Sequence, residues 1–252
     1  MVLKNLIVFI CLSSFYISTA QSVDTVDFHY KHFHLKNLHS GQRKYLVYSE
    51  DSVTQKKSGV YIWERNIALP HHSNAPIVID QKWFSLDSQL FVRTIHSEVD
   101  SHTFLPTLHH TILSAISRPP HTEHYLFTPK LIYTDSLISN KKFKLAIAHP
   151  IFNWELDLEI FSILPLQIGK SFVINFYHPG STILPYYYLY NVEGMTTISR
   201  YAQKSIQCYQ IRINYPNSHN YSIWWVDVKT HNVIKMKEYF NGKYRYKILL
   251  NA

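Results

Sequence analysis

Histidine is the residue type in this chain whose spacing could support metal chemistry. The chain holds 16 histidines, and the segment "HYKHFHLKNLH" gathers four of them. On an extended strand, His32 and His34 would share one face, and they could bind zinc or copper if a third ligand such as His96 came near. A closed zinc site needs four ligands of defined spacing, and no such spacing occurs in the sequence. We therefore predict no metal and no cofactor, with His32 and His34 as the metal-ligand candidates.

Residues for acid–base or nucleophilic catalysis show no recognisable pattern. Glu155, Asp157 and Glu159 alternate with apolar residues, and we expect them to form a solvated face in either a helix or a strand. The chain has no nucleophile elbow, phosphate loop or dinucleotide fingerprint. Cys208 alternates with strand residues in "QCYQIRI" and is typical of a small buried side chain. We predict that the protein is not an enzyme, and a hydrolase stays the weaker alternative.

The composition favours β-structure for the elements that must position these residues. Tyrosine (19) and phenylalanine (14) are abundant, and such residues suit half-buried pleated surfaces. Runs of strand-like residues separated by turn residues predict strands over Val26–Leu35, Lys44–Tyr48, Val60–Ala68, Ile77–Phe84, Leu90–Val99, Tyr125–Leu131, Phe143–Ala148, Ser171–Tyr177, Tyr187–Val192, Ser205–Ile213, Tyr221–Val228, Val233–Tyr239 and Tyr244–Leu250. The two prolines in Ser117–His121 would interrupt a central strand. We predict one β-rich domain over residues 21–252, with residues 117–121 as a candidate subdomain break.

The first twenty residues have the features of a secretory signal peptide. Lys4 precedes the apolar run from Leu6 to Ile17, and small residues ending at Ala20 follow. A membrane anchor would need about twenty apolar residues and a stop-transfer flank. We therefore expect cleavage near Ala20 and a soluble protein that is periplasmic or secreted.

The charge balance is basic without indicating nucleic acid. The formal net charge is +8 with neutral histidine, and the sequence pI is about 9.3. No long basic run occurs, and expected export argues against a nucleic-acid partner. Attraction to an anionic membrane or polysaccharide surface stays open.

The last thirty residues read as three strands with one apolar and one basic face. The predicted apolar face consists of Trp224, Val226, Val228, Ile234, Met236, Tyr244, Tyr246, Ile248 and Leu250. The opposite face carries Asp227, Lys229, Lys235, Lys237, Arg245 and Lys247. Asn241-Gly242 normally signals a two-residue hairpin loop, but that loop would place Met236 opposite Lys247 and mix the faces. A three-residue loop with Gly242 in a bulge is therefore predicted.

The segment around Trp154–Ile163 has an ambiguous pattern. Apolar and acidic residues alternate from Trp154 to Ile160, which indicates a strand. Trp154, Leu158 and Phe161 also share a helical face. Periodicity alone favours the strand.

Phe152–Leu250 resembles a bacterial secreted family of unknown function, numbered 3108. The shared pattern falls on Trp225, Val226, Asp227, Thr230, Val233, Lys235, Lys237, Glu238 and Gly242. The resemblance implies a large curved antiparallel sheet, an open half-barrel, similar to lipoprotein-carrier and sorting proteins. It also implies a short helix around Trp154–Ile163, which we accept against the local period. It brings no catalytic residue.

These observations lead to a binding protein of the cell envelope as the expected function. We expect a lipid or another hydrophobic small molecule to be buried in the concave face of the curved sheet. The residues expected to line that face are Trp224, Val226, Met236, Tyr246 and Ile248. The alternative is a structural or interaction module in which the same face is a filled core without a ligand.

Overall fold

The computed structural model describes residues 22–72, 74–86, 91–115, 118–200, 203–216 and 219–250. The predicted signal peptide lies outside the described residues. Within the described part of the chain, no helix is long and apolar enough to cross a membrane.

The described residues form one large, mainly antiparallel sheet around a short helix. Its strands are β1 (Val23–Val26), β2 (Gly41–Asp51), β3 (Lys57–Ala68), β4 (Ile77–Ser85), β5 (Phe91–Val99), β6 (Pro106–Ala115), β7 (Arg118–Phe127), β8 (Leu131–Thr134), β9 (Lys144–Ala146), β10 (Phe152–Asn153), β11 (Ser171–Tyr177), β12 (Tyr186–Arg200), β13 (Gln203–Asn214), β14 (Tyr221–Asp227), β15 (Val233–Phe240) and β16 (Lys243–Leu249). The helices are the 3-10 turns η1 (Leu35–Asn37) and η2 (Trp154–Leu156) and the α-helix α1 (Asp157–Ile163).

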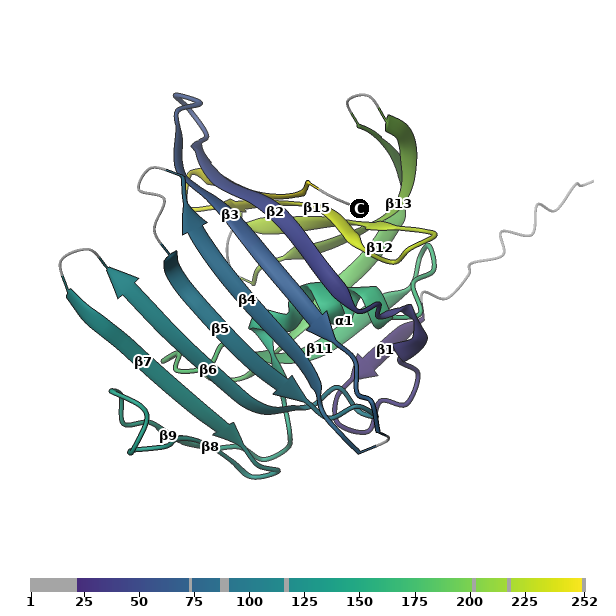
Figure 1. Cartoon of the computed structure of the whole chain (residues 1–252). Coiled ribbons are helices and arrows are strands. Elements are labelled where there is room, and N and C mark those ends of the chain that lie inside the picture. Colours follow the sequence, from purple (N-terminus) through teal and green to yellow (C-terminus); the bar gives the residue numbers. More distant parts are fainter. Residues whose placement is uncertain are drawn as a thin grey trace, which may run out of the picture.

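The order of the strands shows how the two ends of the chain meet. Among the described residues the sheet runs β1-β11-β12-β13-β14-β15-β16-β2-β3-β4-β5-β6-β7-β8-β9, with β10 beside β11. The last strand, β16, pairs antiparallel with β2, so the meander β11–β16 continues directly into β2–β9. Both β1 and β10 pair parallel with β11. The sheet curves around α1 without closing (Figure 1), which confirms the prediction of an open, curved sheet with a short helix.

Helix α1 lies in the segment whose alternating apolar and acidic residues indicate a strand, and it is buried on all sides. Asn153 caps the preceding turn, since its side-chain oxygen accepts a hydrogen bond from the Glu155 backbone N–H at 2.9 Å. All seven residues of α1 are buried. A helix enclosed in this way has no side that faces solvent, so its polar and apolar residues need not separate as they do in a surface helix. Figure 1 shows α1 inside the curve of the sheet, between β2–β7 and β11–β15.

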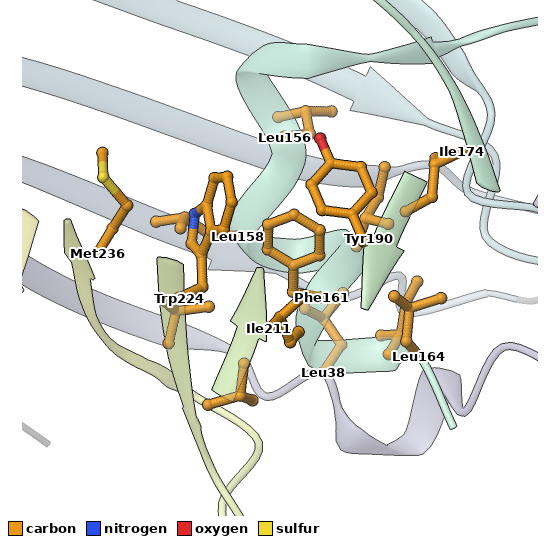
Figure 2. Packing of buried hydrophobic residues seen from close by; sticks show 14 of the residues in the cluster. Leu38, Leu156, Leu158, Phe161, Leu164, Ile174, Tyr190, Ile211, Trp224 and Met236 are labelled. Atoms are coloured by element: carbon orange, nitrogen blue, oxygen red, sulfur yellow. The ribbon is translucent and has the colours of Figure 1, made fainter. Parts of the chain in front are cut away.

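The main core fills the space between α1 and the sheet. Phe161 packs edge-on against Tyr190 and Trp224, with ring centroids 5.1 Å and 5.0 Å away (Figure 2). Met236 on β15 lies opposite Trp224 in the cross-strand register and is 1% exposed. Cutting a buried aromatic side chain such as Phe161 back to alanine costs about 3–5 kcal/mol. This apolar contact fixes α1 to the sheet.

The hairpin between β15 and β16 differs from its prediction. Phe240 pairs with Lys243, so the loop is the two residues Asn241 and Gly242, with φ of 48° and 80°. Both positive φ values are those of the turn that two-residue hairpins favour. The predicted three-residue loop is therefore wrong.

The shorter loop inverts the expected faces of β16. Met236 lies opposite Lys247, which is buried, whereas Tyr246 and Ile248 lie on the face opposite to that of Met236. The prediction assumed that every lysine of the meander faces water. That assumption fails because an acidic side chain of α1, Asp157, faces Lys247 inside the curve.

One predicted strand near the N-terminus and the predicted interruption at the prolines also need correction. The predicted strand Val26–Leu35 is wrong, because β1 ends at Val26 and the exposed His32 and His34 lie in the loop before η1. The prolines of residues 117–121 do not interrupt the sheet: β7 begins at Arg118, and His121 pairs with Leu113 of β6.

Candidate functional site

A groove of about 870 Å³ opens at one end of the half-barrel, beside the start of α1. Its aromatic wall consists of Trp63, Trp83, Trp154, Phe176, Tyr177, Tyr188, Tyr215 and Phe240. Its lip consists of Pro179, Ile183, Leu184 and Pro216. Ile183 and Leu184 are 70% and 66% exposed. The groove therefore offers apolar surface to the solvent.

Cross-strand and interlayer contacts hold the aromatic wall in place. Trp63 of β3 and Trp83 of β4 are paired residues whose rings stack at 4.8 Å. The indole Nε1 of Trp63 donates a hydrogen bond to Gln81 Oε1 at 3.1 Å. On the other side, Trp154 of η2 packs edge-on against Tyr188 of β12 at 4.4 Å. These contacts fix the rings before any ligand arrives, which lowers the entropic cost of binding.

Glu155 gathers two basic side chains at the inner end of the groove. It accepts hydrogen bonds from Arg93 of β5 at 2.9 and 3.3 Å and lies 2.9 Å from His178 Nε2. Burial alone would raise the pKa of the Glu155 carboxyl, but Arg93 and His178 hold it well below its usual range. The hydrogen bond to Glu155 in turn raises the pKa of His178.

A second ion pair on the groove floor is loose. Lys247 Nζ lies 3.8 Å from Asp157 Oδ2 and 4.7 Å from the ring centroid of Trp63. Burial lowers the pKa of Lys247 and raises that of Asp157, because it disfavours the charged form of each group.

A third cluster surrounds Glu238 of β15. Its carboxylate accepts hydrogen bonds from Tyr215 at 3.0 Å and Ser222 at 3.3 Å, and Arg245 Nη2 lies 2.9 Å away. We call the three clusters together the ionic floor; its charged members are Arg93, Glu155, His178, Asp157, Lys247, Glu238 and Arg245. The groove thus combines an apolar wall with a few polar groups, the pattern of small-molecule sites.

A comparison with known protein families identifies the family of this chain. A family model described as "Protein of unknown function (DUF3108)" matches residues 44–249. The chain belongs to the DUF3108 family. The match includes every residue that lines the groove, from Trp63 to Lys247. It confirms the resemblance found in the sequence.

One solved structure is similar to this DUF3108 protein. The crystal structure of a beta-barrel-like protein of domain of unknown function DUF1849 from Brucella abortus has a TM-score of 0.53 and 6% sequence identity. The similarity covers 83% of this chain and 96% of that chain. At this identity the likeness shows the fold alone. No curated protein matches the chain.

The five ligand-binding residues expected from the sequence do not line the groove of the DUF3108 protein. Trp224, Val226 and Met236 are at most 2% exposed and belong to the core that α1 covers. Figure 2 labels Trp224 and Met236 in this core. Tyr246 faces away from α1 and stacks on Tyr48 at 4.9 Å. Ile248 follows on that same outer face, opposite Leu46. The expected set is divided between the two faces because the hairpin loop is one residue shorter than predicted.

One aromatic residue of the groove belongs to a sequence cluster that allowed two interpretations. Tyr188 belongs to the cluster "PYYYLY", which is typical of either a ligand groove or a sheet core.

The expectation that Glu155, Asp157 and Glu159 form a solvated face is wrong. All three carboxylates point to basic side chains on the inner face of the sheet, with Arg65 as the partner of Glu159.

The histidines and the cysteine of the described residues do not form a group that could hold a metal ion. His32 and His34 are exposed, while His96 is bound to Asp80, with His96 Nδ1 2.7 Å from Asp80 Oδ1. Among the residues that the structure describes, no three His, Cys, Asp or Glu side chains are grouped to hold a metal ion. Cys208 is buried, as expected, and burial raises its pKa to about 12, so the thiol stays protonated at neutral pH.

Proposed function

We propose that this DUF3108 protein binds a lipid or another hydrophobic molecule in the groove and does not act as an enzyme. The observation that carries the proposal is the groove of about 870 Å³ with an aromatic wall and an exposed apolar lip. Sites for small molecules commonly have about 300–1,000 Å³ and mostly apolar linings with a few polar groups. Burial of the ligand's apolar surface would supply the binding free energy.

The proposed site differs from the one expected in the sequence. The sequence placed the ligand in the concave face of the sheet, where Phe161 of α1 packs against Trp224. The groove lies beside the start of α1. The class of ligand proposed for it is the one expected from the sequence. We also propose export to the periplasm or the cell exterior, which is supported by the signal-like residues before Gln21.

Tryptophan fluorescence tests binding directly, because Trp63, Trp83 and Trp154 are three of the five tryptophans and all line the groove. Titration with 11-bromoundecanoate, whose bromine quenches nearby indoles, should give saturable quenching with one site per chain. Loss of saturation, or quenching no stronger than that of free tryptophan, contradicts the proposal.

A matched pair of variants localises the site. Leu184→Arg places a charge on the exposed lip and should weaken binding by about tenfold or more, because it removes apolar contact and introduces a solvated cation. Leu137→Arg makes the same change at a side chain that is 93% exposed and outside the groove, and should leave binding unchanged. Equal affinities of the two variants would place the ligand elsewhere.

The filled core under α1 favours a second candidate, an interaction module without a ligand. Trp224 and Met236 are 2% and 1% exposed, as that alternative requires. Native mass spectrometry of the protein from its own host separates the two functions. A stoichiometric apolar ligand supports the binding protein, whereas a ligand-free mass at full occupancy supports the module.

A further inference from the structure

Lys247 is the cation of the ionic floor with the longest ion pair. Arg93 and Arg245 each approach a carboxylate oxygen to 2.9 Å, whereas Lys247 Nζ is 3.8 Å from its acidic partner, Asp157. Within the described part of the chain, the structure gives the Lys247 ammonium this one ion pair and no hydrogen bond. The residue is only 8% exposed. An ammonium has three N–H donors, so Lys247 can still donate hydrogen bonds to a further partner.

The surroundings of Lys247 hold it in this position without satisfying it. Its side chain comes from β16, and its ammonium lies over Trp63, 4.7 Å from the ring centroid. A cation over an aromatic face gains some free energy but forms no directional hydrogen bond. Because Lys247 lines the groove, its donors are available to a molecule that enters there.

The acidic residues Glu155 and Glu238 near Lys247 are balanced by other basic side chains, so they do not exclude an anionic ligand from the groove. Glu155 is neutralised by Arg93 and His178, and Glu238 by Arg245. Burial raises the pKa of Asp157, so this carboxyl takes up a proton more readily than an exposed one. The basic members of the ionic floor are therefore four, against three acidic ones, when His178 is protonated.

We infer that the ligand of the groove is an amphiphile whose anionic oxygen head group, a carboxylate or a phosphate, is bound by Lys247. This inference rests on the proposed function, because it names the polar end of the hydrophobic molecule proposed there. The ammonium donates its free N–H groups to the oxygens of the head group. The aromatic wall and the lip of the same groove receive the alkyl chain. Hydrogen bonds to a charged partner are about twice as strong as neutral ones, so the head group selects among molecules with equal chains.

Calorimetric titration with three probes of equal chain length tests the inference on the wild-type protein. Dodecanoate and dodecyl phosphate carry the two anionic heads, and dodecan-1-ol carries a neutral one; all are used below the concentrations at which they aggregate. We expect at least one anionic probe to bind about tenfold or more tightly than the alcohol. The tighter of the two anions identifies the carboxylate or the phosphate as the source of the head group.

A double variant assigns the selectivity to Lys247. Lys247→Met combined with Asp157→Asn removes both charges, so that neither is left buried alone. In this variant the ratio of the affinities for the anion and the alcohol should fall to about one. The matched control, Lys170→Met with Asp24→Asn, removes an ion pair of 2.8 Å outside the groove and should keep the preference.

The outcomes separate the two proposals. Equal affinity for the anions and the alcohol on the wild-type chain overturns the inference and leaves the proposed function in place. A preference for the anion that persists in the folded Lys247→Met/Asp157→Asn variant also overturns it. Absence of binding by all three probes overturns the proposed function together with the inference. The comparison on the wild-type chain requires no variant to fold.

Discussion

Arg65 of β3 and Glu159 of α1 form an ion pair that is closed off from solvent. Arg65 Nε donates a hydrogen bond to Glu159 Oε1 at 2.9 Å, and Nη2 contacts Oε2. The two side chains are 1% and 4% exposed. Arg65 Nη2 also donates to the backbone oxygen of Glu155 at 3.2 Å. One guanidinium thus joins the sheet to both α1 and the turn before it, and this position sets where Glu155 enters the groove.

Breaking this pair should be strongly destabilising. Glu159→Gln leaves the buried guanidinium without a counter-charge, and removing one partner of a buried ion pair costs about 3–5 kcal/mol. Urea denaturation should therefore show a large loss in the free energy of unfolding. Replacing both partners, Arg65→Met with Glu159→Leu, should cost less than the single variant, because no charge is left unpaired.

An exposed ion pair provides the matched comparison. Lys57 Nζ lies 3.4 Å from Glu50 Oε2, and the lysine side chain is 60% exposed. Lys57→Gln should change the free energy of unfolding by less than about 1 kcal/mol. If Glu159→Gln is as mild as Lys57→Gln, the ion pair does not fix α1 to the sheet.

A buried neutral histidine should make stability sensitive to acid. His109 of β6 is 1% exposed, and its Nδ1 accepts a hydrogen bond from Asn153 Nδ2 at 3.0 Å. Burial lowers the pKa of His109 to about 3, whereas histidine in an unfolded chain titrates near 6.5. Between these values the unfolded chain binds the proton and the folded one does not. The contribution of His109 is therefore complete above about pH 6.5 and falls steadily towards pH 3.

His109→Gln removes this part of the pH dependence. Urea denaturation at a series of pH values from about 6.5 down to 3 should show a flatter decline for the variant than for the wild type. His71→Gln changes an exposed histidine and should leave the slope unaltered. A slope that is the same in His109→Gln and in the wild type would mean that His109 titrates normally in the folded protein.

The sequence predicted the class of fold well because strand patterns are local. The strand β14 (Tyr221–Asp227) lies within one residue of its prediction, and β11 (Ser171–Tyr177) agrees with it. The face of β16 was wrong for a non-local reason. Whether Lys247 points inward depends on Asp157, ninety positions earlier in the chain. Alternation within a strand gives no information about such a partner.

The candidate site was harder to predict than the fold for the same reason. The groove combines Trp63, Arg93, Trp154 and Lys247, which lie far apart in the sequence and meet through the sheet order. No pair of them has a spacing that indicates a motif. The aromatic and acidic residues of the segment 152–163 are buried because the sheet curves around α1. The periodicity of the segment contains no information about that curvature.

The hairpin register can be tested with two residues that the sequence placed on one face. Met236 is 1% exposed in the core, so Met236→Ala should cost about 2–5 kcal/mol. Tyr246 is half-buried on the outer face and stacks on Tyr48, so Tyr246→Ala should cost less than Met236→Ala, because it leaves no cavity in the core. Thermal denaturation compares them. Equal losses would support the three-residue loop predicted from the sequence, in which Met236 and Tyr246 share one face.

Two glycines with the same left-handed backbone conformation should respond differently to an added methyl group. Gly180, in the loop that carries the lip, and Gly242, in the β15–β16 hairpin, have φ of 77° and 80°. Left-handed backbone costs an L-residue about 1–2 kcal/mol, so Gly242→Ala, which meets no atom within 4 Å, should lose about that amount. In Gly180→Ala the new Cβ would lie 2.0 Å from Tyr125 Oη and 2.9 Å from Tyr125 Cζ.

The clash at Gly180 should add to the backbone strain and displace the loop that carries Ile183 and Leu184. Overpacking costs about 1–3 kcal/mol, so the free energy of unfolding should fall further in Gly180→Ala than in Gly242→Ala. Because the lip belongs to the groove, only Gly180→Ala should also weaken quenching by 11-bromoundecanoate. If the two variants lose the same stability and both retain full quenching, the loop after β11 does not rest on Tyr125 in solution.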